Sequence, residues 1–144
     1  MKKILLSLLF LICFEAKSQF CTYDSTLNDF IKEWLGKPYK LGGNTKSGID
    51  CSNFVKTCYK EVYNSFLHGT TKYIFKETNR IEKNMVAVGD ILFFKSKQSP
   101  SGWHCGIYIG NGNFVHAANR KEGVKISSLS EDVYQNNYIG AGRL

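Results

Sequence analysis

The chain has 144 residues, of which 43% are hydrophobic and 22% charged, with 13 glycines, 2 prolines and a formal net charge of +7. This composition excludes a disordered or low-complexity protein. The length predicts one domain built around a single core. The sequence contains no nucleic-acid-binding motif, so we expect no nucleic acid partner despite the basic charge.

Residues 1–18 have the pattern of an export signal. Lys2 and Lys3 precede an apolar run at 4–14, and residues 16–18 place alanine and serine at the two positions that a signal peptidase reads. The apolar run is shorter than the roughly 20 residues of a transmembrane helix, and no later stretch approaches that length. We therefore expect a signal peptide at 1–18, an exported protein in the periplasm, cell envelope or extracellular space, and no integral membrane segment in the mature chain.

Removal of this signal takes away three lysines and one glutamate and leaves a formal charge of +5. A basic protein outside the cytoplasm is expected to associate with polyanions, and cell-wall polymers and anionic membrane surfaces are the abundant ones there. We expect the mature chain, residues 19–144, to be a monomeric single domain.

Two amphipathic helices are predicted in the first half of the mature chain. From Ser25 onward, apolar side chains recur at the spacing of one helical face, namely Leu27, Phe30, Ile31, Trp34 and Leu35. Gly36 and Pro38 end this helix, and an ordered loop follows. Asp50 is a natural N-cap for a second helix, whose apolar face carries Cys51, Phe54, Val55, Cys58 and Val62.

A weaker helix is predicted at 70–82, and after it the apolar pattern changes to the alternation of strands. Five strands are expected, at 91–94, 104–110, 113–118, 123–127 and 137–142. Asn111-Gly112 is a strong hairpin signal between the second and the third of them. Helices followed by meandering strands predict an α+β domain, in which helices cover one face of an antiparallel β-sheet.

Cys51 is the candidate nucleophile, because it lies in the first turn of the second predicted helix. A thiol reacts as the thiolate, and a helix N-terminus and a neighbouring imidazolium both lower its pKa.

Of the three histidines, His68 lies in a polar link and is expected to be an exposed loop residue. His104 and His116 lie on neighbouring predicted strands. His104 would act as general base and then acid, and His116 would orient it.

Strand geometry only partly supports this pairing of histidines. His104 and Gly106 share one face of their strand, and the missing side chain of Gly106 would let the helix end that carries Cys51 approach the sheet. A strict two-residue turn at 111–112 would place His116 on the opposite face, so the turn must be longer or a strand must bulge. Even then, we expect His104 and His116 to be offset by about four residues along the strands, which is roughly 13 Å. Contact between the two side chains would require a further bulge or strong coiling near Gly106.

Metal binding and a disulfide framework are disfavoured by the same pattern. His104 and Cys105 are adjacent, so we expect their side chains on opposite faces of one strand, and no set of residues has zinc-ligand spacing. We expect no metal and no cofactor, and we expect Cys58 and Cys105 to be small apolar core residues. Four cysteines follow residue 18. With one thiol kept for chemistry, at most one disulfide can form, and whether Cys21 joins it is left open.

Five segments, taken in order, resemble the NlpC family of papain-like cell-wall peptidases: WLGKPYKLGG at 34–43, DCSNF at 50–54, GDILFF at 89–94, HCGIYIG at 104–110 and FVHA at 114–117. Each motif alone is weak, but five in the same order with compatible gaps are specific. The resemblance covers nearly all of the mature chain and implies a papain-like α+β fold for 19–144. It also implies that Cys51 is the nucleophile, His104 the base and His116 the third polar group.

The resemblance implies roles for three further side chains. Tyr39 would line the active site and, together with a first-turn backbone N–H of the second helix, stabilise an oxyanion. Asp50 and Ser52 would help to hold the substrate peptide. The family usually has Gly where this chain has Asn53 and Val where it has Cys105. We expect Asn53 to affect the substrate groove and Cys105 to matter little, since Cys and Val are nearly isosteric.

The function implied by the resemblance is that of an exported cysteine endopeptidase that cuts the stem peptide of peptidoglycan. The implied bond joins the γ-carboxyl group of D-glutamate to a diamino acid. Two alternatives stay open. A wall amidase or acyl-transfer enzyme would keep the fold and change the bond, because fold does not settle reaction. A wall-binding scaffold without catalysis is disfavoured because all three candidate catalytic residues are present.

Overall fold

The computed structural model describes residues 25–144, so the predicted signal peptide at 1–18 lies outside the described residues. Residues 25–34 are helical. The other helices are α2 (Cys51–Tyr63), α3 (Thr71–Glu77), the short α4 (Asp132–Gln135) and the 3-10 turn η1 (Lys83–Met85). None of the helices in residues 25–144 combines the length and the apolar character needed to cross a membrane.

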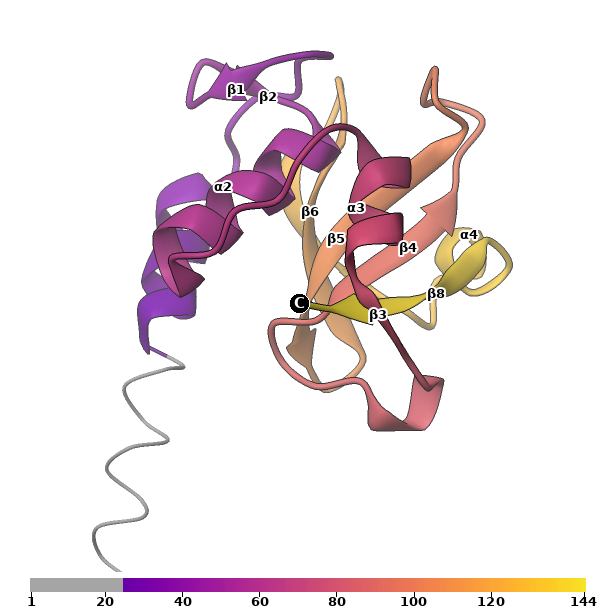
Figure 1. The fold of residues 1–144 in the computed structure, drawn as a ribbon. Coiled ribbons are helices and arrows are strands. Elements are labelled where there is room, and N and C mark those ends of the chain that lie inside the picture. The colour runs from indigo at the N-terminus through magenta and orange to yellow at the C-terminus, as the bar shows by residue number, and fades with distance from the viewer. Residues whose placement is uncertain (1–24) are drawn as a thin grey trace, which may run out of the picture.

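Six strands form one antiparallel sheet, and helices precede it in the chain as predicted (Figure 1). The strands are β3 (Asn79–Ile81), β4 (Ile91–Lys95), β5 (Trp103–Gly110), β6 (Asn113–Asn119), β7 (Gly123–Ser128) and β8 (Tyr138–Arg143). Their order across the sheet is β3-β8-β4-β5-β6-β7, and every pairing is antiparallel. A separate ribbon of β1 (Asn44–Thr45) and β2 (Gly48–Ile49) precedes α2. The α+β prediction is confirmed.

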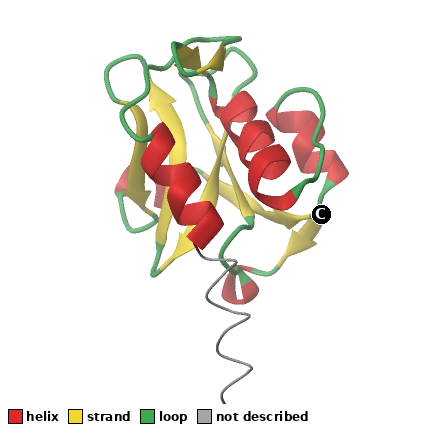
Figure 2. Cartoon of the chain, turned by 90° about the vertical axis from the view of Figure 1, so that its left-hand side faces the viewer, coloured by secondary structure: helices red, strands yellow, loops and turns green. Residues whose placement is uncertain are grey.

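The main core lies between the helices of the first half and one face of the sheet (Figure 2). Its largest fully buried side chains include Phe54, Phe93, Ile49, Ile74 and Ile107. A smaller cluster lies on the opposite face and consists of Leu92, Phe94, Phe114 and Ala141, closed by rings that include Tyr134 of α4. Both faces of the sheet are therefore buried, which the prediction of helices on one face did not include.

The first helix ends one residue earlier than its apolar pattern predicts. Four of the five expected side chains are buried, namely Leu27, Phe30, Ile31 and Trp34. Leu35, however, is 40% exposed. Gly36 follows it with a φ of 76°, and the Gly36 N–H donates to the carbonyl of Val124 at 2.9 Å. This left-handed residue turns the chain toward β7 before Leu35 can join the helical face, so the prediction for Leu35 is wrong.

The predicted helix at 70–82 is correct only over its first half. α3 ends at Glu77, and from Asn79 the chain pairs with β8 as an edge strand. The Thr78 hydroxyl donates to the Ile74 carbonyl at 2.9 Å and closes the last helical turn. The strand that follows depends on pairing with Arg143 and its neighbours, and such a distant partner leaves no local signal in the sequence.

The hairpin between β5 and β6 contains the irregularity that the histidines require. Its aligned pairs are Ile107 with Val115, Tyr108 with Phe114, and Gly110 with Asn113. Ile109 is therefore an extra residue on β5, which is the definition of a β-bulge. The prediction that the turn is longer or that a strand bulges is confirmed.

This bulge sets His116 opposite Gly106, on the face that also carries His104. The histidines are thus about two residues out of register instead of the expected four. The aligned pairs of this hairpin end at Ile107 and Val115, so the further bulge or strong coiling near Gly106 stays a prediction. A Cβ on Gly106 would lie 2.8 Å from a ring atom of Phe114 and 2.9 Å from Cβ of His116. The missing side chain therefore makes room for His116, and not for the helix end that carries Cys51 as predicted.

Substitution Gly106→Ala tests this close packing. We expect it to lower the free energy of unfolding by about 1–3 kcal/mol, because the added methyl group overlaps His116 and Phe114 in a region that is already filled. Urea denaturation measures the change. Gly140→Ala is the matched control, since Gly140 lies in β8 of the same sheet and an added Cβ there meets no atom within 4 Å. Equal losses of stability in the two variants would contradict this role of Gly106.

Candidate active site

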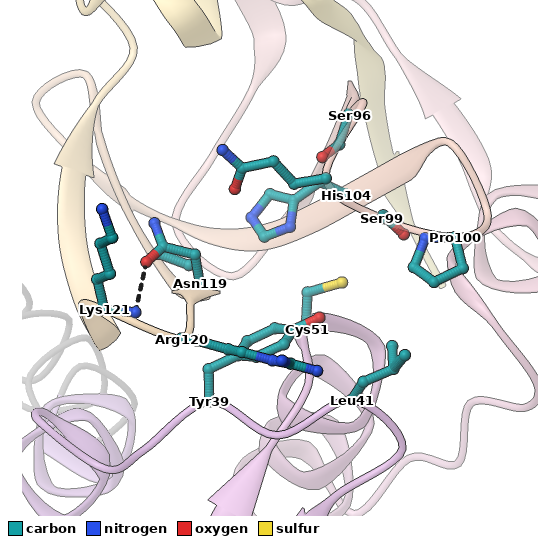
Figure 3. Close-up of a pocket in the computed structure, with 12 residues that line it drawn as sticks. Tyr39, Leu41, Cys51, Ser96, Ser99, Pro100, His104, Asn119, Arg120 and Lys121 are labelled. Atoms are coloured by element: carbon teal, nitrogen blue, oxygen red, sulfur yellow. Dashed lines mark hydrogen bonds between the residues drawn. The ribbon is translucent and has the colours of Figure 1, made fainter.

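A pocket of about 490 Å³ opens where α2 and β5 begin (Figure 3). Cys51, His104 and Tyr39 line it, and its walls come from 96–100, between β4 and β5, and from 118–121, at the turn between β6 and β7. The pocket thus joins elements that are far apart in the sequence. It brings the predicted nucleophile and the predicted base into one cavity.

Cys51 lies at the first position of α2, and its side chain is almost buried, with 6% exposure. The pKa of its thiol lies well below the ordinary value. The largest cause is a hydrogen bond with the Cys105 side chain, and His104 lowers the pKa further through a hydrogen bond and its charge, whereas burial acts in the opposite direction. The backbone N–H groups of a first helical turn also favour the anion. The site therefore favours the thiolate form of Cys51.

His104 and His116 form a hydrogen-bonded pair. Nε2 of His104 lies 2.7 Å from Nδ1 of His116, and Nε2 of His116 lies 3.0 Å from the hydroxyl of Ser127. Because Nε2 of His104 is engaged by His116, Nδ1 is the nitrogen left for Cys51. The chain from sulfur to imidazole to imidazole to hydroxyl has the order of a nucleophile, a base and an orienting group.

His116 is held neutral by its surroundings. It is fully buried and lies among the rings of Phe114 and Tyr134, at 4.6 Å and 5.3 Å between centroids. Burial lowers the pKa of His116 well below its ordinary value, and the charges of His104 and Lys125 lower it further. A neutral imidazole has one donor and one acceptor. When His104 is an imidazolium, both of its ring nitrogens donate, so Nδ1 of His116 accepts from His104 and the proton on Nε2 of His116 is directed at Ser127.

Cys105 lies beside the candidate nucleophile, which the sequence analysis did not predict. The Thr71 hydroxyl lies 3.4 Å from Sγ of Cys105 and 3.8 Å from Sγ of Cys51. Burial is the largest cause that raises the pKa of Cys105 well above its ordinary value, followed by the hydrogen bond with Cys51 and then its negative charge, so Cys105 stays a thiol and can donate. The prediction that Cys105 is a core residue is confirmed, since it is fully buried in the main core. Its contact with the sulfur of Cys51 is an additional feature, and whether Cys105 matters little stays a prediction.

Side-chain alternation is obeyed on β5, although both neighbours reach Cys51. Cys105 belongs to the core cluster on the helix face, whereas His104 pairs with Phe94 on the other face. The sulfur of Cys51 lies near the first residues of β5, where side chains from both faces come within reach. The one feature of the sequence that could have placed Cys105 near Cys51 is its position next to His104. Side-chain alternation along a strand argued against that inference, because neighbouring side chains point to opposite faces.

Tyr39 lines the pocket as the resemblance implied. Burial is the largest cause that raises the pKa of its phenol, and the charges of Cys51 and Asp50 raise it further, whereas Arg120 lowers it. A backbone bridge between Tyr39 and Ile49 fixes the main chain from which this side chain extends. Tyr39 therefore presents a protonated hydroxyl to the cavity that contains Cys51.

Asp50 and Ser52 are engaged with the protein's own backbone and with each other. The Asp50 carboxylate accepts from the N–H groups of Gly42 and Asn53, each at 2.8 Å, and from the Ser52 hydroxyl at 3.0 Å. Asn53 in turn donates through its side chain to the carbonyl of Gly43 at 2.8 Å. These bonds join the start of α2 to the 42–43 loop. Substrate contacts by Asp50 and Ser52, and an effect of Asn53 on the groove, stay predictions.

The third histidine, the pairing of the cysteines and metal binding were the other points that the sequence raised. His68 is exposed, with its Nδ1 2.8 Å from a carboxylate oxygen of Glu77. Cys51, Cys58 and Cys105 are free thiols, and Cys21 lies outside the described residues. Within residues 25–144, no three His, Cys, Asp or Glu side chains are grouped so that they could hold a metal ion.

Comparison with known proteins gives the family. The sequence profile described as the NlpC/P60 family matches residues 36–143. The chain belongs to the NlpC/P60 family. The resemblance drawn from the five sequence motifs is thereby confirmed.

Similar proteins within the family are curated as endopeptidases. The chain is 38% identical over 118 residues to a protein of Escherichia coli K12 named "Probable endopeptidase NlpC", covering 82% of this chain and 76% of that protein. It is 37% identical over 120 residues to "Murein DD-endopeptidase MepS/Murein LD-carboxypeptidase" of the same strain, covering 83% of this chain and 62% of that protein. The chain therefore spans less than two thirds of the second relative.

The fold is also shared with solved structures of the family. One from Bacillus cereus ATCC 10987 superposes with a TM-score of 0.75 at 30% identity, over 83% of this chain and 39% of that chain. The papain-like α+β prediction is confirmed by this match together with the observed helices and sheet.

Substitution Cys105→Val tests whether the second thiol keeps Cys51 ionised. Valine has nearly the same volume and cannot donate, so we expect the pKa of Cys51 to rise. Below neutral pH, alkylation of Cys51 by iodoacetamide should then slow by about tenfold, the loss expected for one hydrogen bond to a charged group. The rate at high pH should not fall, because a more basic thiolate is at least as nucleophilic.

Peptide mass spectrometry follows the reaction at Cys51 alone. Cys58→Val is the control, because Cys58 is a buried thiol of α2 whose pKa is raised by burial and which has no hydrogen bond with Cys51. An alkylation profile of Cys105→Val that coincides with the wild-type profile would contradict a donor role for Cys105.

Proposed function

We propose that the protein is a peptidoglycan hydrolase, a cysteine endopeptidase that cuts the stem peptide with Cys51, His104 and His116. The observation that carries the proposal is the hydrogen-bonded series from the Cys51 thiolate through His104 and His116 to Ser127 in a pocket open to solvent. Membership of the NlpC/P60 family, and the curated names of relatives as endopeptidases, support the same conclusion.

The chemistry follows from the positions of these groups. The thiolate of Cys51 attacks the carbonyl carbon of the scissile amide, and the resulting oxyanion accepts hydrogen bonds from the Cys51 backbone N–H and the Tyr39 hydroxyl. Imidazolium His104 protonates the leaving amine, and as a neutral base it then deprotonates the water that hydrolyses the thioester. His116 does not react. It accepts from Nε2 of His104 and so keeps Nδ1 directed at the sulfur.

The bond that we propose joins the γ-carboxyl group of D-glutamate to the diamino acid. The proposed site of action is outside the cytoplasm, after removal of residues 1–18. The basic charge of the mature chain would bring it to the anionic polymers of the wall. Neither a metal nor an organic cofactor takes part in the proposed steps.

Defined stem peptides, analysed by mass spectrometry after incubation, test both the bond and the residues. We expect wild-type protein to release the fragments of the γ-glutamyl bond, and Cys51→Ala and His104→Ala to release none. His116→Ala should retain a measurable rate, lowered by about 100-fold, because an orienting group contributes less than the base it holds.

The fragment masses also separate the alternative functions. Fragments cut at the amide between sugar and peptide would indicate a wall amidase, and transfer of the acyl group to an added amine would indicate an acyl-transfer enzyme. Binding of wall sacculi with no fragment released by the wild type would indicate a scaffold. Full cleavage by Cys51→Ala would contradict the proposed mechanism.

A further inference from the structure

The turn between β6 and β7 places two cationic side chains on the wall of the pocket. Arg120 and Lys121 both line the cavity that contains Cys51. Figure 3 shows the Arg120 side chain extending across the pocket from this turn, in front of the Tyr39 ring. The electrostatic effect of Arg120 on the Tyr39 phenol agrees with this placement. The guanidinium group therefore lies in the space that a substrate bound at Cys51 would occupy.

The backbone of this turn is held in place from within. The side-chain oxygen of Asn119 accepts from the N–H groups of Lys121 and Glu122, at 2.9 Å and 3.1 Å. Gly123, with a φ of 67°, packs so closely on the carbonyl of Lys37 that a Cβ would not fit there. The turn is thus anchored against the segment that leads to Tyr39, and the root of the Arg120 side chain has a defined position.

The acidic groups around these cations are already occupied. Glu122, the one carboxylate of the turn, accepts from Lys125 at 2.9 Å and from the Asn119 side chain at 2.6 Å. Asp50, beneath the pocket, accepts from three donors of the α2 cap and loop. Among the ion pairs of the described residues, Arg120 and Lys121 have no part. Two cations without an acidic partner among the described residues thus remain on the wall of the pocket that contains Cys51.

A guanidinium group without a partner matches a carboxylate well. Its planar fork donates two parallel hydrogen bonds to the two carboxylate oxygens, whereas a neutral carboxamide accepts only one and carries no charge. A peptide linked through the γ-carboxyl group of glutamate keeps its α-carboxylate free, a few bonds from the carbonyl carbon that Cys51 attacks.

We propose that Arg120, assisted by Lys121, binds a free carboxylate of the substrate next to the scissile bond, so that the protein selects acidic peptides over their amidated forms. This specificity site deepens the proposed function and rests on it for the identity of the peptide. The binding chemistry itself depends only on the cations and the sulfur. It can therefore be tested without assuming which bond is cut.

The first test uses two small reagents that differ only in this group. Iodoacetate carries a carboxylate and iodoacetamide a carboxamide, and both alkylate Cys51 by loss of iodide. We expect the ratio of their rate constants, iodoacetate over iodoacetamide, to fall about tenfold in Arg120→Gln, because one charge-assisted interaction is lost. Any change in the pKa of Cys51 affects both reagents equally and leaves this ratio unchanged.

Lys60→Gln is the matched control for net charge. Lys60 is an exposed cation in the last turn of α2, at the opposite end of that helix from Cys51. We expect this variant to keep the wild-type ratio. Arg120 is itself an exposed turn residue, so its substitution does not threaten folding. A wild-type ratio in Arg120→Gln would overturn the carboxylate site.

The second test uses a pair of γ-D-glutamyl peptides, one with a free α-carboxylate and one with the α-carboxamide. We expect wild-type kcat/KM to favour the acid by about tenfold and Arg120→Gln to cleave the two at similar rates. If neither peptide is cut but the alkylation ratio still falls in Arg120→Gln, the proposed bond is wrong and the carboxylate site is supported. If wild type cuts both peptides equally and the ratio does not change, the carboxylate site is wrong and the hydrolase proposal stands.

Discussion

One contact between secondary-structure elements underlies the whole site: the thiol at the first residue of α2 meets the imidazole at the second residue of β5. A helix N-terminus favours a thiolate, but a thiolate packed against a core loses its water, and that loss raises its pKa. Donors from β5 take the place of the lost water and lower the pKa of Cys51, which favours the anion. The cap of α2 serves this contact, since Asp50 fixes both the first helical turn and the loop in front of it.

A second constraint is the burial of His116. A fully buried imidazole must satisfy both ring nitrogens, and here His104 and Ser127 do so. The bulge at Ile109 places this ring on the same face of the sheet as His104. The missing side chain of Gly106 leaves the room that the ring needs there. The orientation of His104, the proposed base, thus depends on two backbone features of β5: the bulge at Ile109 and the absent side chain of Gly106.

Two residues near the sulfur depart from the family pattern that the sequence motifs implied, and a third side chain adds charge to the pocket. Where the family usually has Val, Cys105 adds a donor within the hydrogen-bonding environment of the nucleophile. Where the family usually has Gly, Asn53 joins the α2 cap to the loop at Gly43. The β6–β7 turn contributes Arg120 as a cation without an acidic partner. In the proposed mechanism, the start of α2 and the histidine pair carry the reaction, Cys105 adjusts the state of the sulfur, and Arg120 selects the substrate.

The sequence by itself determined the helices at 25–34 and 51–63, the position of Cys51 at a helix start, and a hairpin with an irregularity, because periodicity, capping and turn chemistry are local. The motifs added the family and the candidate triad. Only the tertiary structure decided the surroundings of the sulfur. Thr71, Cys105 and Arg120 come from three elements that are distant in the sequence. Side-chain alternation along β5 could not place Cys105 near the sulfur, because Cys51 approaches the first residues of β5, where side chains of both faces are within reach.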